Sequence, residues 1–391
     1  MALIGTEHSP HLFHMEKIAF VLRPLGFFLL SMMLFLIGIC QHSFTRGIYA
    51  FLYTAAALFC FSHLQSFPPE VATFFLGWTV HTSGILLLGE TSLGRFSLSS
   101  FDELKTVFFM WTNFRGVERF YNTITPENST VRPRLSFAMR RTLRTLGLLA
   151  LNHGMTELLV KPTLASLGII RSDFSPAKRG LVPPVGRVDL ILRLIMSTLW
   201  IWKTYFALTI SHDAFAVLFV SMLYWNDESE WPPLFGSLSE AISISRFWGS
   251  FWHRLHVLPI LRLQPSISYH GYYPRWICQN AMVRNGIRAL WIFLCSAACH
   301  GALNHVVYGR AYLEAELRFF LINWCVCLAE TVLKRVNIGI GRYSNVRNSA
   351  QNGIVSLLGR IGGHAFVLGF FFCTVPAWRY PLIYDSIPGV G

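Results

Sequence analysis

An imidazole surrounded by small residues is the feature of this sequence best suited to chemistry. His300 lies in an apolar run among alanine, cysteine and glycine residues, and small side chains leave space beside a helix or let backbones approach. At helical spacing His300 shares a face with Phe293, Ala297 and Asn304, whereas His305 points elsewhere. A neutral imidazole can abstract a proton near neutral pH. His300 is therefore a candidate general base, although the residues alone leave a structural role open.

A second dense stretch runs from Arg246 to His256 and combines bulky aromatic residues with two histidines and two arginines. Trp252 and His253 lie near its centre. Such a density of aromatic and basic residues makes the stretch a candidate functional segment. It is equally typical of an amphipathic interfacial helix in the aromatic belt of a membrane protein.

The sequence motifs give little support for a metal site or a nucleotide-binding site. The 14 histidines raise the question of a di-iron site. Such a site needs several HxxxH and HxxHH boxes, which His253/His256 and the wider His300/His305 pair do not form. The eight cysteines include no CxxC pair, which argues against a zinc site or a disulfide framework. No P-loop and no GxSxG elbow occurs. We therefore expect no metal and no permanently bound cofactor.

The composition requires a membrane. Of 391 residues, 53% are hydrophobic and only 14% charged, against roughly a quarter charged in soluble domains, and the mean hydropathy is +0.45. The net charge of +13 is spread over loops between apolar runs, without an RNA-binding motif. It fits juxtamembrane charge beside anionic headgroups, and part of it could serve an anionic substrate such as a coenzyme.

Apolar runs near 20 residues long predict about seven to nine transmembrane helices. The first is expected to be an anchor, since no small-residue cleavage site follows it. A break at Ser211-His212-Asp213 divides one long run into two, of which the second is the less certain. The candidate runs are Ile18–Cys40, Ile48–Leu64, Val71–Gly89, Leu143–Val160, Val188–Ile210, Ala214–Trp225, Ile287–Val307, Leu317–Leu333 and Val355–Trp378.

Three long loops are predicted between these runs. The loop Glu90–Thr142 contains most of an arginine cluster (Arg132, Arg134, Arg140, Arg141, with Arg144 just beyond) and Phe108–Trp111, which could lie flat in the interface. Lys161–Arg187 is also basic, and Asn226–Asn285 holds the aromatic stretch. Because only Leu143–Val160 separates the two basic loops, that run is either re-entrant or leaves one basic loop on the far side.

Ionisable residues inside apolar runs are costly, so each is a functional hypothesis. Arg193 and Lys203 can snorkel or form pairs. Glu157 and Glu330 lie near the ends of runs, where a structural role is the simpler interpretation. Further such residues are His81, His153, His212, Asp213 and His364. A bond to a neighbouring helix suffices to explain His81 and His364.

Taken together, the two stretches resemble the membrane-bound O-acyltransferase superfamily, and more narrowly its wax-synthase-like branch with the fungal terpenoid and meroterpenoid O-acetyltransferases. The likeness is strongest over residues 212–309. It rests on Trp231-Pro232-Pro233-Leu234-Phe235-Gly236-Ser237, on the segment from Ser245 to His253, and on Ser296-Ala297-Ala298-Cys299-His300-Gly301. The resemblance implies one all-α membrane domain, residues 1–391, whose helices surround an intramembrane reaction chamber.

The resemblance also implies an activity: transfer of an acyl group, most simply acetyl from acetyl-CoA, to the hydroxyl of a lipophilic secondary metabolite in terpenoid or meroterpenoid biosynthesis. His300 would be the catalytic base, with Asn304 orienting it and His253 as a further catalytic candidate. The residues implied to bind the substrate and acyl-CoA are Phe247, Trp248, Trp252, Arg246 and Arg254, with the arginine cluster as candidates for the coenzyme phosphates. Membrane lipid and the lipophilic alcohol are the other partners, and the endoplasmic reticulum is the expected location.

The sequence departs from the sterol and diacylglycerol acyltransferases of the superfamily. Where their motif has an acidic residue and a terminal asparagine, this chain has Ser250 and His253. Two alternatives therefore stay open. One is a long-chain acyl-CoA:alcohol ester (wax) synthase, and the other is a non-enzymatic transporter or biosynthetic scaffold. A transporter would be favoured by inverted repeats, and none is evident in the sequence.

Overall fold

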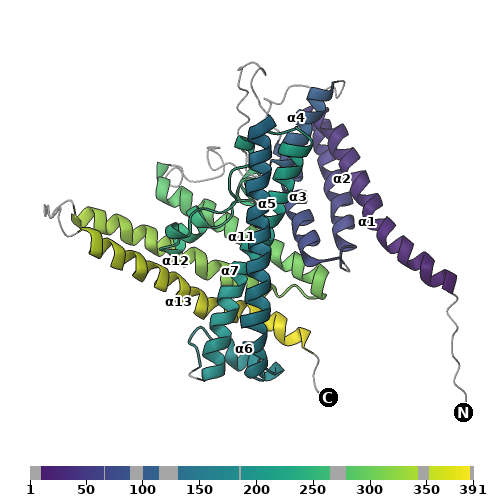
Figure 1. Cartoon of the computed structure of the whole chain (residues 1–391). Coiled ribbons are helices and arrows are strands. Elements are labelled where there is room, and N and C mark those ends of the chain that lie inside the picture. Colours follow the sequence, from purple (N-terminus) through teal and green to yellow (C-terminus); the bar gives the residue numbers. More distant parts are fainter. Residues whose placement is uncertain are drawn as a thin grey trace, which may run out of the picture. The chain divides into compact units, whose positions relative to one another are not determined.

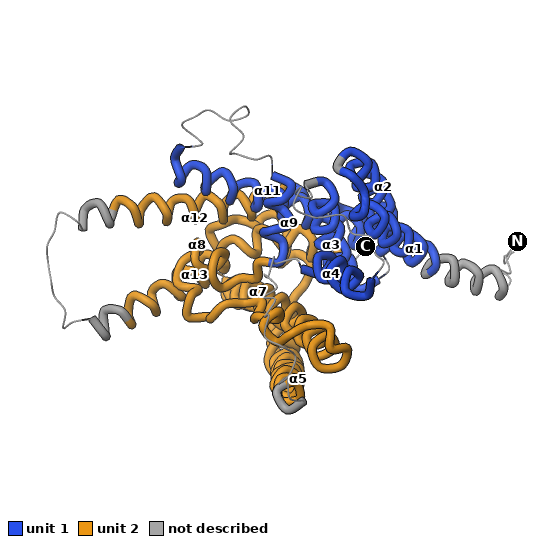
Figure 2. Tube along the Cα trace, turned by 90° about the horizontal axis from the view of Figure 1, so that it is seen from above, with its two compact units in different colours: residues 1–116, 255–313 blue, residues 117–254, 314–391 orange. Residues whose placement is uncertain are grey.

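The computed structural model describes residues 10–65, 67–88, 100–113, 131–184, 186–264, 279–341 and 352–387. Within these ranges the protein is built of helices joined by loops and contains no strand (Figure 1). The predicted all-α class is thus confirmed. The chain forms two compact units, residues 1–116 with 255–313 and residues 117–254 with 314–391 (Figure 2). Each unit is described by itself below.

The first unit is organised around α3. The neighbouring helices α2, α9 and α11 all pack against it, and α1 packs along α2. Its helices are α1 (Pro10–Ile39), α2 (Ser43–Ser62), α3 (Pro69–Leu88), α4 (Phe101–Thr112), α9 (Val257–Arg262) and α11 (Ala281–Tyr308). The core between α1, α2 and α3 combines aromatic residues with alanines, such as Phe35 and Ala57, both fully buried. Small residues there let the helices approach closely.

Helix α4 contains the Phe108–Trp111 stretch and contributes to this core. Trp111 lies against Trp78 of α3 with ring centroids 4.1 Å apart, and its carbonyl oxygen accepts a hydrogen bond from the Trp78 indole at 3.1 Å. His81, one turn further along α3, is fully buried and lies 3.0 Å from the carbonyl oxygen of Met110. The structural interpretation of His81, a bond to a neighbouring helix, is therefore confirmed.

The second unit is built on three long helices, α7, α12 and α13, with α5 packed along α7. The loops between these helices contain short helical turns. Its elements are α5 (Val131–Gly154), η2 (Met155–Val160), α6 (Lys161–Ser166), η3 (Arg171–Phe174), η4 (Pro176–Lys178), α7 (Arg187–Ala216), η5 (Val217–Met222), η6 (Glu228–Glu230), η7 (Leu238–Glu240), α8 (Ile244–Arg246), η8 (Phe247–Phe251), α12 (Leu313–Gly341) and α13 (Asn352–Ser386).

The arginine cluster was predicted to lie mostly in a loop, and this is wrong. The helical segments α5, η2 and α6 follow one another without a break, so the whole cluster lies on α5. A helix this basic is stable because acidic residues elsewhere in the unit face it. Arg141 and Arg144 bond Asp213, and Arg140 lies 3.3 Å from Glu228. These partners are distant in sequence, so local composition did not reveal them.

The predicted break at residues 211–213 is also wrong. Helix α7 passes through these residues and continues directly into the π-helical turns of η5. The reason is that Asp213, which is only 1% exposed, is neutralised by two arginines of α5 instead of by water. A paired charge can remain inside a helix where an unpaired charge would be costly.

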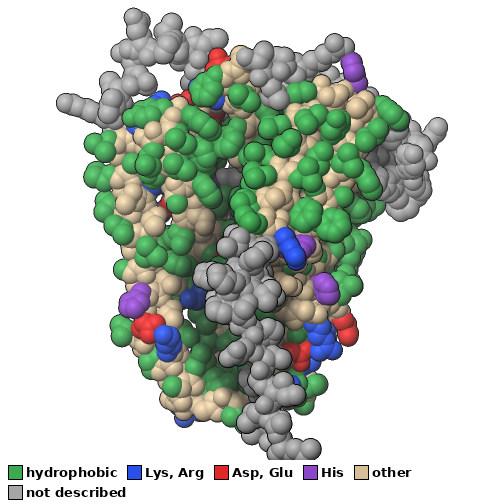
Figure 3. All heavy atoms as spheres, turned by 90° about the vertical axis from the view of Figure 1, so that its right-hand side faces the viewer, with side chains coloured by type: hydrophobic (Ala, Val, Ile, Leu, Met, Phe, Trp, Pro, Cys, Tyr) green, Lys and Arg blue, Asp and Glu red, His purple; other side chains and the backbone are tan. Residues whose placement is uncertain are grey.

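Five helices of the described residues are long and apolar enough to cross a membrane: Leu22–Ile39, Phe44–Ser62, Arg187–Met222, Ala281–Tyr308 and Leu357–Ser386. Their apolar side chains are extensively exposed, as the hydrophobic surface in Figure 3 shows. Phe51, for example, is 73% exposed. A soluble protein rarely presents so much apolar surface. The protein is therefore a multi-pass membrane protein, and seven to nine spans stays a prediction.

Two basic residues predicted inside the apolar runs form hydrogen bonds to other segments of the second unit. Arg193 is fully buried and donates from Nη2 to the carbonyl oxygens of Lys178 and Gly180, at 2.6 and 2.9 Å. Lys203 of α7 donates to Asn152 of α5 at 3.1 Å. Of the two predicted behaviours, snorkelling and pairing, Arg193 thus shows neither, because it bonds backbone carbonyls inside the protein.

Candidate active site

The aromatic stretch begins with a helix start that a distant carboxylate holds in place. The Oγ atom of Ser243 accepts a hydrogen bond from the backbone N–H of Arg246 at 3.3 Å, as an N-cap does. Glu330 of α12 accepts two more, from the N–H groups of Ile244 and Ser245, each at 2.8 Å. The first N–H groups of a helix otherwise lack partners, and the helix dipole favours an anion there. Glu330 therefore fixes where the segment starts.

A second contact from α12 holds the segment about one turn further on. The indole N–H of Trp248 donates to Oδ1 of Asn323 at 2.8 Å. Asn323 is fully buried, and its amide nitrogen donates to the carbonyl oxygen of Phe319 at 2.9 Å. Since Asn323 and Glu330 are seven residues apart, they lie on the same face of α12. One helix face thus positions both the start and the first tryptophan of the segment.

An aromatic cluster encloses the segment. The ring of Phe247 stacks on that of Trp252 with centroids 5.1 Å apart, and Trp200 of α7 lies 5.1 Å from Trp252. Phe371 of α13 lies 4.7 Å from Phe247 and 5.1 Å from Trp200. Phe247 and Trp252 are 1% and 4% exposed. The predicted substrate-binding residues Phe247, Trp248 and Trp252 therefore lie together.

A glycine allows the loop at residues 231–237 to touch the aromatic segment. The backbone N–H of Gly236 donates to the carbonyl oxygen of Phe251 at 2.9 Å. A Cβ atom on Gly236 would overlap the backbone carbonyl of Ser250. Only glycine fits such a close approach of two backbones. Two of the three sequence features that carry the resemblance, the WPPLFGS loop and the aromatic segment, are thus joined at Gly236.

The polar residues of the segment differ in their surroundings. His253 is half-buried, with its ring 5.3 Å from Trp252 and 5.7 Å from Phe235. Arg246 forms an ion pair with Glu240. Arg254 is exposed and forms no ion pair with the described residues. Of the two arginines proposed for the coenzyme, one is already engaged by a carboxylate and the other faces outward.

Helix α11 of the first unit carries His300. Its N-terminus is capped by Asn280, whose side-chain oxygen accepts from the N–H groups of Met282 and Val283 at 3.0 and 3.4 Å. It ends at Gly309 with a φ of +72°, the left-handed conformation that glycine adopts at helix ends. Trp291 anchors the middle by donating to the carbonyl oxygen of Ile260 at 3.0 Å.

The predicted face of α11 is present. Phe293, Ala297 and Asn304 are 8%, 0% and 3% exposed, and His300 beside them is half-buried. His305 is exposed, as expected for a residue on another face. The small residues are used for packing, since a Cβ atom on Gly301 would lie 3.4 Å from the carbonyl oxygen of Ala311. His300 thus lies at the edge of a tightly packed face.

The predicted site residues divide between the two units. His300 and Asn304 belong to the first unit, while Arg246, Phe247, Trp248, Trp252, His253 and Arg254 belong to the second. Sequence reasoning missed Asn323 and assigned Glu330 only a general structural role. Their spacing of seven residues on one helical run was the available signal. Among the described residues, no cluster of three or more metal-ligating side chains occurs.

Residues 231–322 match the membrane bound O-acyl transferase family. This region includes the WPPLFGS loop, the aromatic segment and His300, so the resemblance predicted from those residues is confirmed. The fold and the sequence together define a multi-pass helical membrane protein with this family's sequence features.

The chain is also similar to fungal transferases. It is 27% identical to acetyltransferase nanB of Aspergillus nanangensis over 48% of this chain and 43% of that protein. It is 24% identical to acetyltransferase aurG of Calcarisporium arbuscula over 60% of this chain and 57% of that protein. A short match, 47% identical over 53 residues, covers 11% of this chain and 12% of the O-mevalon transferase yanI of Aspergillus niger. The chain spans about half the length of the first two proteins. No solved structure matches it.

Proposed function

We propose that this protein is an acyl-CoA-dependent O-acyltransferase that transfers acetyl from acetyl-CoA to a hydroxyl of a lipophilic secondary metabolite. The observation that carries the proposal is the family match over residues 231–322, which contains the aromatic segment and His300 in one stretch. The similarity to two fungal acetyltransferases supports acetyl as the transferred group. Under this proposal the chain is one acyltransferase domain with its reaction chamber inside the endoplasmic reticulum membrane.

The proposed reaction needs one base. The imidazole of His300 takes the proton of the acceptor hydroxyl while its oxygen attacks the thioester carbonyl carbon. The carbon–sulfur bond then breaks, the ester remains on the acceptor, and the coenzyme thiolate takes the proton back from the imidazolium. General-base help of this kind is worth roughly 10²–10⁴-fold in rate. Asn304, one turn from His300, is assigned the role of orienting the imidazole.

The second unit would supply binding. In this proposal the buried rings of Phe247 and Trp252 and the half-buried ring of Trp248 form a rigid apolar wall for the acyl thioester or the acceptor. His253 lies at the end of that wall as a second candidate acid–base group. Arg254 is exposed, and with Arg246 it is a candidate for the coenzyme phosphates. The acceptor would reach the site from lipid and the polar coenzyme from water.

The test uses the full chain in microsomes or purified in detergent. The protein is incubated with acetyl-CoA and a panel of terpenoid and meroterpenoid alcohols, and release of free coenzyme A is measured together with the acetylated product. We expect His300→Ala to reduce turnover at least 10²-fold at unchanged protein level. The matched control is His305→Ala, because His305 lies on the same helix but is exposed.

Two outcomes would overturn the proposal. Transfer retained by His300→Ala would remove the catalytic role of that histidine. The absence of transfer from every acyl-CoA, with correctly inserted protein, would favour a transporter or scaffold. The alcohol that accumulates in a deletion strain should be the substrate that the purified protein acetylates.

A different acyl group is a second candidate. The match at 47% identity over 53 residues is to an O-mevalon transferase, a name that indicates a donor other than acetyl for that protein. A series of acyl-CoA donors, from acetyl through mevalonyl to palmitoyl, separates the possibilities. Preference for long chains would assign the protein as a wax-type ester synthase instead of an acetyltransferase.

A further inference from the structure

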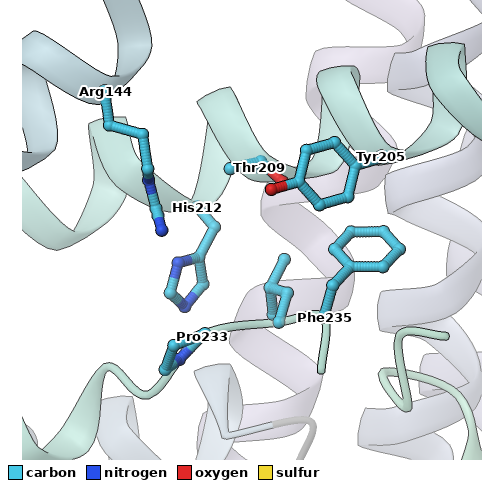
Figure 4. A pocket seen from close by; sticks show the side chains of 7 residues that line it. Arg144, Tyr205, Thr209, His212, Pro233 and Phe235 are labelled. Carbon is cyan, nitrogen blue, oxygen red and sulfur yellow. The ribbon is translucent and has the colours of Figure 1, made fainter. Parts of the chain in front are cut away.

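A small polar pocket lies in the second unit beside the aromatic segment (Figure 4). The space open to the centre of a water-sized sphere is about 40 Å³. This is room for a small polar group, such as one phosphate, and not for a whole coenzyme. It is lined by Arg144, Tyr205, Thr209, His212, Pro233, Leu234 and Phe235.

The hydroxyl of Thr209 differs from those of the other buried threonines of the described helices. Thr79, Thr82 and Thr374 each donate to the carbonyl oxygen four residues earlier. Thr209 is only 5% exposed, yet among the described residues its hydroxyl makes no hydrogen bond. It lines the pocket, with the Tyr205 hydroxyl facing it in Figure 4. Because this hydroxyl lines the pocket, we expect it to bond a ligand or ordered water there.

Arg144 brings positive charge to the same pocket. Its Nε donates to Oδ2 of Asp213 at 2.7 Å and its Nη2 bonds the other carboxylate oxygen. This side-on pairing uses two of the five guanidinium N–H groups. Asp213 is also bonded by Arg141 at 2.8 Å, so two guanidinium groups face one carboxylate. An excess positive charge therefore remains at the pocket, and Figure 4 shows the Arg144 guanidinium directed toward His212.

The pocket shares a wall with the aromatic segment. The ring of Phe235 lies 4.8 Å from that of Tyr205 on the pocket side. The same ring lies 5.5 Å from Trp252 and 5.7 Å from His253 on the other side. A ligand group in the pocket is thus one ring away from the residues that the proposed function assigns to the thioester and the acceptor.

We propose that this pocket binds one phosphate group of the acyl-CoA cosubstrate, through the Arg144 guanidinium, the hydroxyls of Thr209 and Tyr205, and the His212 imidazole. This inference rests on the proposed function. Guanidinium and hydroxyl donors around a net positive charge match a phosphate oxyanion. An anionic lipid headgroup offers the same chemistry. The coenzyme is the occupant proposed here, because its flexible pantetheine arm can join a phosphate in the pocket to a thioester on the other side of Phe235.

The test removes hydroxyls without removing charge. Thr209→Val and Tyr205→Phe are compared with Thr204→Val, which deletes a helical hydroxyl on α7 outside the pocket. For each variant, kcat/KM is measured with acetyl-CoA and with S-acetylpantetheine, which lacks every phosphate of the coenzyme. Acetyl-3′-dephospho-CoA then identifies which phosphate is bound. Thermal unfolding verifies that each variant is folded.

We expect each pocket variant to lower kcat/KM for acetyl-CoA about tenfold, the loss of one hydrogen bond to a charged group. The value for S-acetylpantetheine should not change, and Thr204→Val should resemble the unmutated protein with both donors. Equal losses with the two donors, or no loss with either, would overturn the assignment.

A binding measurement separates failure of this inference from failure of the proposed function. Coenzyme A is titrated calorimetrically into the purified protein in nanodiscs of phosphatidylcholine, with and without phosphatidylglycerol. If no donor is turned over but Thr209→Val weakens coenzyme binding and Thr204→Val does not, the pocket assignment stands and the reaction is wrong. If the pocket variants instead leave coenzyme binding unchanged and weaken retention of phosphatidylglycerol, the phosphate belongs to lipid and the coenzyme assignment is overturned.

Discussion

The carboxylate of Glu330 accepts hydrogen bonds from two consecutive backbone N–H groups, of which the first belongs to Ile244, at 2.8 Å each. This contact joins α12 to the start of the aromatic segment across 86 residues of sequence. A carboxylate at a helix start satisfies N–H groups that otherwise lack partners and complements the positive end of the helix dipole. Glu330 is therefore a positioning residue for the segment that follows.

Replacing Glu330 by alanine should destabilise the second unit. Loss of the two bonds should lower the free energy of unfolding by about 2 kcal/mol, read as a lower melting temperature of the purified protein. Phe247 and Trp252, the proposed binding wall, lie just beyond this helix start. Their displacement should weaken substrate binding more than it affects the base at His300. We therefore expect KM to rise by a larger factor than kcat falls.

The conservative variant Glu330→Gln retains one carbonyl oxygen and should recover part of the stability. Glu314→Ala serves as the control, because Glu314 lies on the same helix and is exposed. Equal melting temperatures for Glu330→Ala and the unmutated protein would mean that the two hydrogen bonds do not hold the segment.

Two glycines of the family-like region should respond oppositely to alanine. A Cβ atom at position 236 would overlap the Ser250 carbonyl, whereas a Cβ at Gly249 would meet nothing within 4 Å. We expect Gly236→Ala to separate the WPPLFGS loop from the aromatic segment and to abolish accumulation of folded protein. Gly249→Ala should leave the melting temperature unchanged or raise it slightly, since alanine is favoured over glycine in helical backbone. Similar expression and stability of the two variants would contradict this close approach.

The sequence predicted the all-α class, several long apolar helices and the face of α11 shared by His300 and Asn304, because each of these depends on local periodicity. It did not predict contacts between distant residues. Arg141 and Asp213 are 72 positions apart, so the arginines were assigned to a loop and the helix was broken at the aspartate. Glu330 and Ile244 are further apart still. Such pairings depend on the packing of helices, which a single sequence does not encode as a pattern.

The cluster formed by Asp213, Arg141 and Arg144 should be sensitive to loss of its single carboxylate. Asp213→Asn would leave Arg141 and Arg144 facing each other without compensation, and breaking a buried pair typically costs about 3–5 kcal/mol. The variant should therefore fail to accumulate or melt much earlier. Arg140→Ala on the same helix removes a more exposed contact to Glu228 and should cost about 0–1 kcal/mol. Comparable losses for the two variants would show that burial of the Asp213 cluster is unimportant for stability.

His256 should make the protein sensitive to acid. It lies outside the five candidate spans, and burial lowers its pKa from 6.5 to about 4. Between those values the unfolded chain binds a proton that the folded protein does not, so the free energy of unfolding falls as pH drops from about 6.5 to about 4. Above 6.5 this histidine contributes no pH dependence. Replacing it with phenylalanine, which carries no titrating group, should reduce the fall in melting temperature between pH 7 and pH 4.5.

The slope with pH is the informative quantity in this experiment, because a phenylalanine also alters packing and can shift the melting temperature at every pH. His305→Gln is the control, since His305 is exposed and its replacement should leave the slope as in the unmutated protein. If His256→Phe loses as much stability on acidification as the unmutated protein, another group must take up the proton, and the burial of His256 is not the source of the acid sensitivity.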